Sequence, residues 1–385
     1  MSLSVWQDSN KKENLYADIL IVGAGITGIS LAFWIGQHDP SIRILIVDKN
    51  EIGSGATGRN AGFLTTGSVG YFMKLTEDLG EEKAIAYWKF SEENHRLLLE
   101  HVIQDDQSLH YERQGSFSLA TDDASLQELL ATEKIMRQAG INLEAIGAEI
   151  LKKEINVEGF IGAVKYPKDG VVHPVKMLDK MKNMTGNLQI KENSIVYQVD
   201  TDSSKVKVLT PDYIIETPTV IYACNGYLPG IDSYFQEKVT AEKGQILMTE
   251  PADPCMKGTA YERSQKIYFR QLPKGELLIG GARECDDRST ANNEISDKVQ
   301  GALEDFIQMH LPSFQRKKVI RRWAGVMGFT ESKLPLMGHL PEDSRIYFVG
   351  GYTGHGMGLA FNSAKSLVEH ILHGKTLPST VIQSL

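Results

Sequence analysis

Residues 18–47 constrain the fold of this chain more than any other stretch. A short apolar run over 18–22 leads into Gly23, and the glycines that follow have the spacing G-x-G-x-x-G. An uncharged segment of helical character comes next, and a second apolar, β-branched run over 42–47 closes the stretch. This order predicts a strand, a tight turn, a helix and a second strand, which is the first half of a dinucleotide-binding unit.

The glycines of this motif are Gly23, Gly25 and Gly28. In such a unit the first allows a sharp turn, the second lets a pyrophosphate approach the backbone, and the third lets the helix pack close to the sheet. The expected helix begins at Ile26 and Thr27, and its N-terminus presents N–H groups and a partial positive charge to phosphates. Asp48 follows the second strand, 25 residues after the first glycine, where a carboxylate can accept hydrogen bonds from an adenosine ribose.

Two other interpretations of this stretch are possible, a structural turn and a membrane span. A glycine triplet alone also occurs in structural turns, but the strand–helix context and the acid at the right distance favour a nucleotide site. Residues 19–36 are uncharged for 18 positions, which is near the length of a membrane span. Three interior glycines and the break in periodicity after Val22 favour a strand and a helix instead, so we expect no membrane span.

The composition is that of a soluble globular protein. The chain has 385 residues, of which 42% are apolar and 23% charged, so two domains or one large composite are expected. The formal net charge of −8 gives no basic surface for nucleic acid or an anionic membrane. Residues 1–13 are polar and lack the apolar core of a signal peptide, and we expect residues 1–14 to form a flexible tail.

The cysteines and histidines indicate neither a disulfide framework nor a metal site. The three cysteines, Cys224, Cys255 and Cys285, are widely spaced and form no CxxC motif. The ten histidines are interpreted as individual side chains and not as metal ligands. A reducing, cytoplasmic setting fits this pattern best, and the sequence leaves the oligomeric state open.

The rest of the chain alternates between helical and strand-rich segments. Helices are expected over 72–104, 122–140 and 297–311, with many short strands between the second and third. A final apolar strand at 345–349 leads through a run of glycines into a last helix. The strand-rich middle and the helical insert predict discontinuous domains, which excludes a simple six-stranded Rossmann dehydrogenase.

A second glycine-rich loop indicates that the nucleotide is FAD and not NAD. Residues 53–62 follow the ribose acid directly and suit a long cofactor that continues past the pyrophosphate. The C-terminal block adds a strand, glycines 350–358 and a helix aimed back at the nucleotide.

Several blocks together resemble the D-amino-acid-oxidase-like family of FAD oxidoreductases, which includes glycine oxidase, sarcosine oxidase and γ-glutamylputrescine oxidase. The resemblance covers roughly residues 17–373, and the order and spacing of the blocks are more specific than any one of them. The blocks are Gly23-Ala24-Gly25-Ile26-Thr27-Gly28, Gly55-Ala56-Thr57-Gly58-Arg59-Asn60-Ala61-Gly62, Ala223-Cys224-Asn225-Gly226, Tyr268-Phe269-Arg270, Leu277-Leu278-Ile279-Gly280-Gly281, Trp323-Ala324-Gly325, Pro335-Leu336-Met337-Gly338 and Gly350 to Gly358.

The resemblance implies an α/β fold, α+β overall, with two domains. One is a Rossmann-like FAD-binding domain with a parallel sheet, and the other is a substrate domain built on a mostly antiparallel sheet with helices. The expected FAD-binding segments are 15–70, 145–235 and 325–385, and the expected substrate segments are 71–144 and 236–324.

The resemblance also implies an extended FAD molecule whose adenine half lies on the first unit. The expected cofactor-binding residues are Gly23, Gly25, Ile26, Thr27, Gly28, Asp48, Lys49, Gly55, Ala56, Thr57, Arg59, Asn60, Ala61, Val196, Ala223, Gly226, Gly325, Gly354, Gly356 and Met357. Some family members bind flavin through a cysteine after the tryptophan motif. Residues 326–330 contain no cysteine, so we expect non-covalent FAD.

The chemistry implied by this similarity is oxidation of a C–N bond in a small amine or amino acid. A hydride passes to flavin N5, the imine hydrolyses, and oxygen reoxidises the flavin to give hydrogen peroxide. Tyr268 and Arg270 share one face of a strand, and an arginine there could clamp a carboxylate. His355 lies among the glycines near the expected flavin edge, and these three are the expected catalytic residues; Lys266 is a weaker candidate.

One departure from the family bears on the substrate. Amino-acid-oxidising relatives place a carboxylate-binding arginine at the position that aligns near Met327. This chain has a methionine there, followed by Gly328, and so lacks that arginine. We therefore expect a substrate amine whose acid group lies farther from the nitrogen, or an amine without an acid group. The exception would be a chain in which Arg270 or Arg59 replaces the missing carboxylate-binding arginine. The Gly354-His355-Gly356 signature resembles the γ-glutamylputrescine-oxidase-like branch.

Three other functions remain open at this point. A dehydrogenase of the same fold would pass electrons to a quinone or a carrier protein, although no basic amphipathic membrane-docking stretch is apparent. A flavin-dependent RNA-modification module is disfavoured by the acidic balance. An NAD-dependent reductase would bind no flavin.

Overall fold

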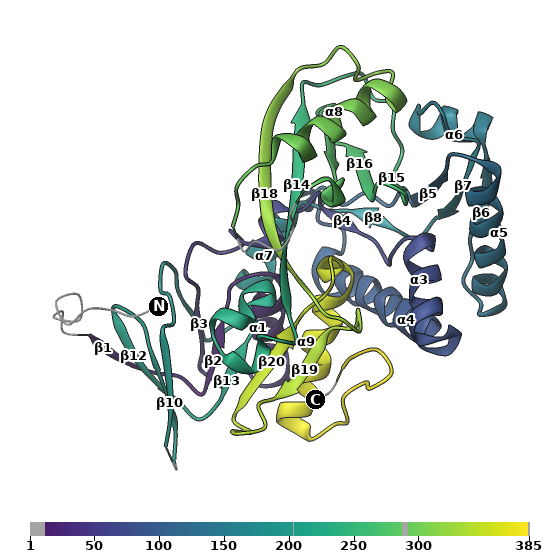
Figure 1. Ribbon diagram of the computed structural model, residues 1–385. Coiled ribbons are helices and arrows are strands. Elements are labelled where there is room, and N and C mark those ends of the chain that lie inside the picture. The colour runs from purple at the N-terminus through teal and green to yellow at the C-terminus, as the bar shows by residue number, and fades with distance from the viewer. Residues whose placement is uncertain (1–11, 203, 287–291, 384–385) are drawn as a thin grey trace.

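Two large sheets form the frame of the molecule in the computed structural model, which describes residues 12–202, 204–286 and 292–383 (Figure 1). The first sheet has six strands in the order β19-β20-β13-β2-β3-β9. All neighbours are parallel except β19 and β20. Its strands are β2 (Ile19–Val22), β3 (Ile44–Val47), β9 (Leu188–Lys191), β13 (Val220–Tyr222), β19 (Leu336–His339) and β20 (Ile346–Gly350).

The helices on the six-stranded sheet include the one that follows the glycine motif. Helix α1 (Ile26–His38) packs against α9 (Gly356–His373), and α9 packs against α4 (Glu81–Leu98). Helix α7 (Pro174–Asn183) also contacts α1. Strands β2 and β3 are buried at every position, as expected for a parallel sheet covered on both faces. The strand–turn–helix–strand prediction for residues 18–47 is therefore confirmed.

The second sheet has eight strands in the order β18-β14-β17-β16-β15-β5-β7-β6 and is antiparallel except for the β15–β5 pair. Helix α8 (Asp297–His310) covers part of it. The long strands β14 and β18 extend from this sheet towards the six-stranded one (Figure 1). The strands are β5 (Ser116–Ala120), β6 (Glu144–Gly147), β7 (Gly162–Tyr166), β14 (Thr240–Thr249), β15 (Thr259–Glu262), β16 (Ile267–Gln271), β17 (Leu277–Gly280) and β18 (Val319–Phe329).

The remaining elements are smaller. A four-stranded sheet has the order β1-β12-β11-β10, and β4 pairs with β8. These strands are β1 (Glu13–Tyr16), β4 (Phe63–Leu64), β8 (Gly170–Val171), β10 (Gln198–Thr201), β11 (Val206–Leu209) and β12 (Tyr213–Thr217). Helices α2 (Ala56–Arg59), α3 (Val69–Leu79), α5 (Asp123–Gln138) and α6 (Ala148–Ile155) complete the α-helical elements of the described ranges.

Several boundaries differ from the sequence predictions. The single helix expected over 72–104 is divided at Gly80, whose φ of +87° ends α3 before α4 begins. A π-helical turn, Leu99–Ile103, then closes α4. The helix expected over 122–140 starts one residue later, after a capping box in which Asp122 accepts from the backbone N–H of Ser125.

The structure also locates the segments assigned to domains. The six-stranded sheet draws on all three segments expected to bind FAD. Strands β6 and β7 lie within or next to segment 145–235 but belong to the eight-stranded sheet. Glu13 and Asn14, expected at the end of a flexible tail, pair with Tyr213 and Ile214 in β1–β12. The rest of that tail, residues 1–11, lies outside the described residues.

No helix in the described part of the chain is long and apolar enough to cross a membrane. The span that residues 19–36 could have formed is divided between β2, the glycine turn and α1.

Candidate functional site

The glycine motif forms the close turn that the sequence predicts. Gly23 has a φ of +112°, a conformation that L side chains rarely adopt. A Cβ atom on Gly28 would lie 1.8 Å from the carbonyl oxygen of Gly23, so only glycine lets α1 approach β2 this closely. The N–H of Ile26 donates to Oγ1 of Thr57 at 2.9 Å, which ties the start of α1 to the second glycine-rich loop.

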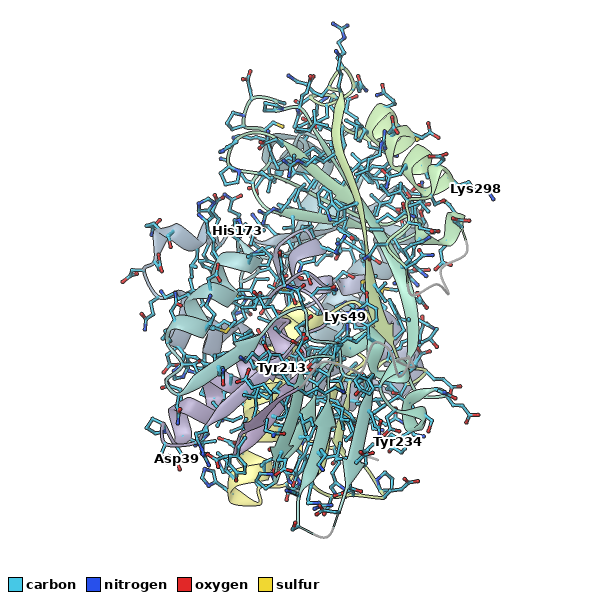
Figure 2. The ribbon with its side chains drawn as sticks, turned by 90° about the vertical axis from the view of Figure 1, so that its left-hand side faces the viewer. Asp39, Lys49, His173, Tyr213, Tyr234 and Lys298 are labelled. Atoms are coloured by element: carbon cyan, nitrogen blue, oxygen red, sulfur yellow. The ribbon has the colours of Figure 1, made fainter. Side chains whose placement is uncertain are left out.

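Asp48 closes this turn at the carboxyl end of β3. Its Oδ2 accepts from the N–H of Ala24 at 2.7 Å, and its Oδ1 accepts from the N–H of Asn50 at 2.9 Å. Burial raises the pKa of Asp48, while these two hydrogen bonds act in the opposite direction. The ammonium of Lys49 lies 3.3 Å from the centre of the Tyr227 ring. Figure 2 shows Lys49 in the middle of the molecule and Asp39, beyond the other end of β3, at its lower edge.

A cavity of about 710 Å³ follows the carboxyl ends of the parallel strands. Ligands of open α/β sheets bind in this location. All the predicted cofactor residues line this cavity except Gly28, Ala61 and Gly325. Gly28 lies beneath it as a packing residue, whereas Ala61 and Gly325 line a second, adjacent cavity.

The second glycine-rich loop is fixed to β18 by Arg59. Its Nε donates to the carbonyl of Ser54 at 2.8 Å, and its Nη1 donates to the carbonyl of Ala324 at 2.9 Å. The indole Nε1 of Trp323 in turn donates to the carbonyl of Arg59 at 2.8 Å. A Cβ on Gly325 would lie 3.0 Å from Cβ of Arg59, so the glycine of the tryptophan motif makes room for this contact.

The adjacent cavity has a volume of about 240 Å³ and lies between this loop, the eight-stranded sheet and the start of α9. Its lining includes the aromatic rings of Phe63, Tyr71, Tyr261 and Tyr268. The two cavities share six lining residues, so they meet at one wall. The shared residues are Ala56, Arg59, Asn60, Met327, Gly354 and Met357.

The family model described as FAD dependent oxidoreductase matches residues 18–370. The chain belongs to this family. The resemblance inferred from the sequence motifs is thereby confirmed, and the protein is an FAD-dependent oxidoreductase.

Individual relatives are distant but cover nearly the whole chain. The γ-glutamylputrescine oxidoreductase of Escherichia coli is 24% identical over 384 residues, which span 94% of this chain and 85% of the relative. The glycine oxidase of Bacillus subtilis is 25% identical over 355 residues, 89% of each chain. A solved glycine oxidase from Bacillus cereus has a TM-score of 0.80 at 19% identity and covers 94% of this chain and 96% of its own, which shows the shared fold.

The residues of the larger cavity fit the FAD of this family. A dinucleotide needs a side-chain-free approach at the pyrophosphate, and the turn at Gly23 and Gly25 provides one. It also needs an acceptor at the ribose, where Asp48 lines the cavity. The lining of this cavity also includes Thr57, Asn60 and Met357, so the cavity continues beyond the turn that would hold the pyrophosphate.

His355 lines the smaller cavity, next to Gly354 of the shared wall. Its ring stacks on that of Tyr71 with 3.8 Å between the centroids. Its Nδ1 lies 2.9 Å from the carbonyl oxygen of Thr353, and it must donate there because a carbonyl only accepts. Burial lowers the pKa of His355 to about 4. The neutral ring therefore has Nε2 as a hydrogen-bond acceptor at ordinary pH.

Tyr268 also lines the smaller cavity. Its ring lies edge-on to Phe63, 5.7 Å between centroids, and burial raises the pKa of its hydroxyl to about 12. Because of this raised pKa, Tyr268 keeps a protonated hydroxyl at neutral pH. Lys266, the weaker candidate, lines the same cavity, but its ammonium pairs with Glu284.

Arg270 is not brought to either cavity, which corrects its expected position as a clamp. Its side chain is 5% exposed, and its Nη1 donates to the carbonyl of Gly62 at 3.2 Å. Strand periodicity places it on the same face as Tyr268, but the loop at Gly62 covers that part of the face. Burial lowers its pKa to about 10.

Arg283 is a cavity residue that the sequence reasoning missed. It follows β17 by three residues, just beyond the matched block that ends at Gly281. Its position after the hairpin of β16 and β17 was the available signal, because Tyr268 lies in the first strand of the same hairpin.

Proposed function

We propose that this FAD-dependent oxidoreductase oxidises a C–N bond of a small amine or amino acid that binds in the 240 Å³ cavity. The carrying observation is the wall shared by the two cavities, where Asn60, Met327 and Met357 face both. A cofactor that fills the larger cavity would present its flavin end to a substrate in the smaller one. When bound, FAD supplies the two-electron acceptor for this reaction.

The substrate cavity suits a neutral amine. Its wall includes the rings of Phe63, Tyr71, Phe117, Tyr261 and Tyr268. His355 is uncharged above about pH 5 because burial lowers its pKa to about 4. Nε2 of His355 can accept a hydrogen bond from the amine, and the Tyr268 hydroxyl can donate one. A substrate nitrogen held without its extra proton keeps the lone pair that C–H oxidation beside nitrogen requires.

The start of α9 supports the flavin end of the cofactor. Met357 and Gly356 line the larger cavity at the helix N-terminus, where backbone N–H groups favour negative charge. Two side chains of α4 hold this turn: Nδ2 of Asn94 donates to the carbonyl of Met357 at 3.1 Å, and Oγ of Ser91 donates to that of Gly358 at 2.7 Å. The helix end is thus pre-organised for charge that builds up on the pyrimidine ring.

We propose that FAD is held without a covalent bond. Cys224 lines the larger cavity, but it lies near Asp48 at the adenosine end and its Sγ donates to the carbonyl of Val22 at 3.0 Å. Burial raises the pKa of this thiol to about 12, so it is a poor nucleophile. Acid precipitation is expected to release all the flavin into the supernatant; flavin retained in the pellet would contradict this.

We also propose oxygen as the acceptor that restores FAD, with hydrogen peroxide as product. The test is turnover of an amine and amino-acid panel in air, with peroxide and the aldehyde or keto product measured in the same samples. Equal amounts of both are expected for at least one substrate. If product forms only with an added quinone or dye, the acceptor is not oxygen. If no product forms under either condition, the proposed function is wrong.

A further inference from the structure

Arg283 is directed at the substrate cavity by an unusual backbone path. Strand β17 ends at Gly280, and the next two residues have positive φ, +120° at Gly281 and +50° at Ala282. A Cβ on Gly281 would lie 2.1 Å from the carbonyl oxygen of Lys266. The chain therefore turns back tightly against the loop before β16 and fixes where Arg283 leaves the backbone.

The guanidinium of Arg283 packs against side chains of β14 and β18. It is 4.4 Å from the centre of the Phe329 ring, and its Nη1 is 3.6 Å from Oε2 of Glu242. Glu242 is directly opposite Met327 in the β14–β18 ladder, and Phe329 is two positions along the strand, so all three side chains share one face. Met327 belongs to the wall shared by the two cavities, and Arg283 lines the smaller one, so the Arg283 charge lies on the strand face that leads to this wall.

The hydrogen bonding of Arg283 is incomplete. Among the described residues its buried Nε has no hydrogen-bond partner, and the 3.6 Å between Nη1 and Oε2 of Glu242 is longer than a hydrogen bond. A buried donor without a hydrogen bond raises the free energy of the folded protein. A ligand that accepts a hydrogen bond from this donor removes that penalty and binds more tightly as a result. Glu242 does not itself line the cavity, so it holds the arginine from behind.

The other basic side chains at this cavity are engaged elsewhere. Arg59 donates to the carbonyls of Ser54 and Ala324, and Lys266 pairs with Glu284. His355 is neutral. The Arg283 charge opposes the burial-driven rise in the pKa of Tyr71, Tyr261 and Tyr268, so the rings around the cavity lie within its field.

We propose that Arg283 binds a carboxylate carried by the amine substrate and so selects amines that also bear an acid group. This inference rests on the proposed function of the same cavity. Arginine suits the role because its fork of donors matches the two oxygens of a carboxylate. The carboxylate would take the unpaired Nε together with one terminal nitrogen, while the apolar rings exclude water from the pair.

The test is binding of ligands that cannot be oxidised. Straight-chain carboxylic acids of two to six carbons are compared with their primary amides, by calorimetry and by perturbation of the visible spectrum of the FAD-loaded protein. The wild-type protein is expected to bind at least one acid more tightly than its amide. Arg283→Met is expected to weaken binding of that acid about 10- to 100-fold, the range for a hydrogen-bonded charge, with amide binding unchanged.

Two further variants control for structure. Lys266→Met removes a cation from the same cavity and is expected to preserve the acid preference, whereas Arg283→Lys is expected to retain part of it. No preference for any acid over its amide in the wild-type protein would overturn the proposal. Equal loss of acid and amide binding in Arg283→Met would do the same, since it indicates a packing role. Neither the acid nor the amide is oxidised, so their binding can be measured even if the protein does not oxidise amines. The two proposals can therefore fail separately.

Discussion

The two cavities are built in different ways, and the difference explains which of them the sequence reveals. Much of the nucleotide cavity comes from residues 23–60, and its key features are backbone conformations and missing side chains, such as Gly23 and Gly28. The substrate cavity combines the loop of Arg59 with residues of α3, β15, β16 and the start of α9, which are far apart in the chain. A motif can encode the first because local spacing sets it, whereas the second depends on tertiary packing.

The largest expected effect of a single substitution lies in the nucleotide half. Gly28→Ala puts a Cβ 1.8 Å from the Gly23 carbonyl, so α1 must move away from β2 and the pyrophosphate turn is lost. We expect protein that retains little or no FAD, measured as visible absorbance per protein. The matched control is Gly301→Ala in α8, where a Cβ meets open space. It is expected to keep full flavin content and to gain about 0.5–1 kcal/mol in unfolding free energy.

Loss of the ribose acceptor should have a smaller effect. Asp48→Ala removes the carboxylate that accepts from Ala24 and faces the cavity, so the dissociation constant for FAD is expected to rise about 10- to 100-fold. Titration of the FAD-free protein measures it. Asp18→Ala, which breaks an exposed ion pair with Arg43, is the control and should leave FAD affinity unchanged. Equal losses in both variants would mean that Asp48 has no specific part in cofactor binding.

Tyr268→Phe is expected to weaken substrate binding without affecting FAD binding. It removes one hydroxyl from the substrate cavity and nothing from the nucleotide cavity, so flavin content should not change. Binding of the best amine is expected to weaken about 2- to 10-fold, as for one neutral hydrogen bond. The measurement is flavin absorbance per protein together with the amine dissociation constant. Loss of FAD from this variant would show that the two cavities are not independent.

The last effect concerns stability rather than binding and is a pH dependence from His355. Its pKa is about 4 in the folded protein and lies near 6.5 when unfolded, so the unfolded state binds more protons between these values. His355 therefore contributes a loss of stability as pH falls from about 6.5 to 4 and no change above that window. Denaturant unfolding of the wild-type protein and His355→Gln should give a stability difference that varies only there.

This difference isolates His355 from another buried group. Burial raises the pKa of Asp169 to about 7, and its contribution has the opposite sign because stability falls as pH rises towards that value. Asp169 is present in both proteins and cancels. A difference that is constant from pH 4 to 7 would contradict the lowered pKa of His355.

Arg270 and Arg283 show where prediction from sequence ended. Alternation along β16 places Arg270 on the face of Tyr268, but it does not reveal that the loop at Gly62 covers that part of the sheet. The approach of Arg283 depends on a left-handed conformation at Ala282, a residue that rarely adopts it. The glycine turn, Asp48 and the loop of Arg59 were predicted because each is determined within a short stretch of chain.

The central claim is that an amine in the smaller cavity reduces FAD bound in the larger one. A stoichiometric titration of the FAD-loaded protein without oxygen tests it most directly, with amines added singly and the visible absorbance followed. We expect at least one amine to bleach the bound flavin fully and to leave one aldehyde or keto product per flavin. Bleaching by a reduced nicotinamide but by no amine would contradict it.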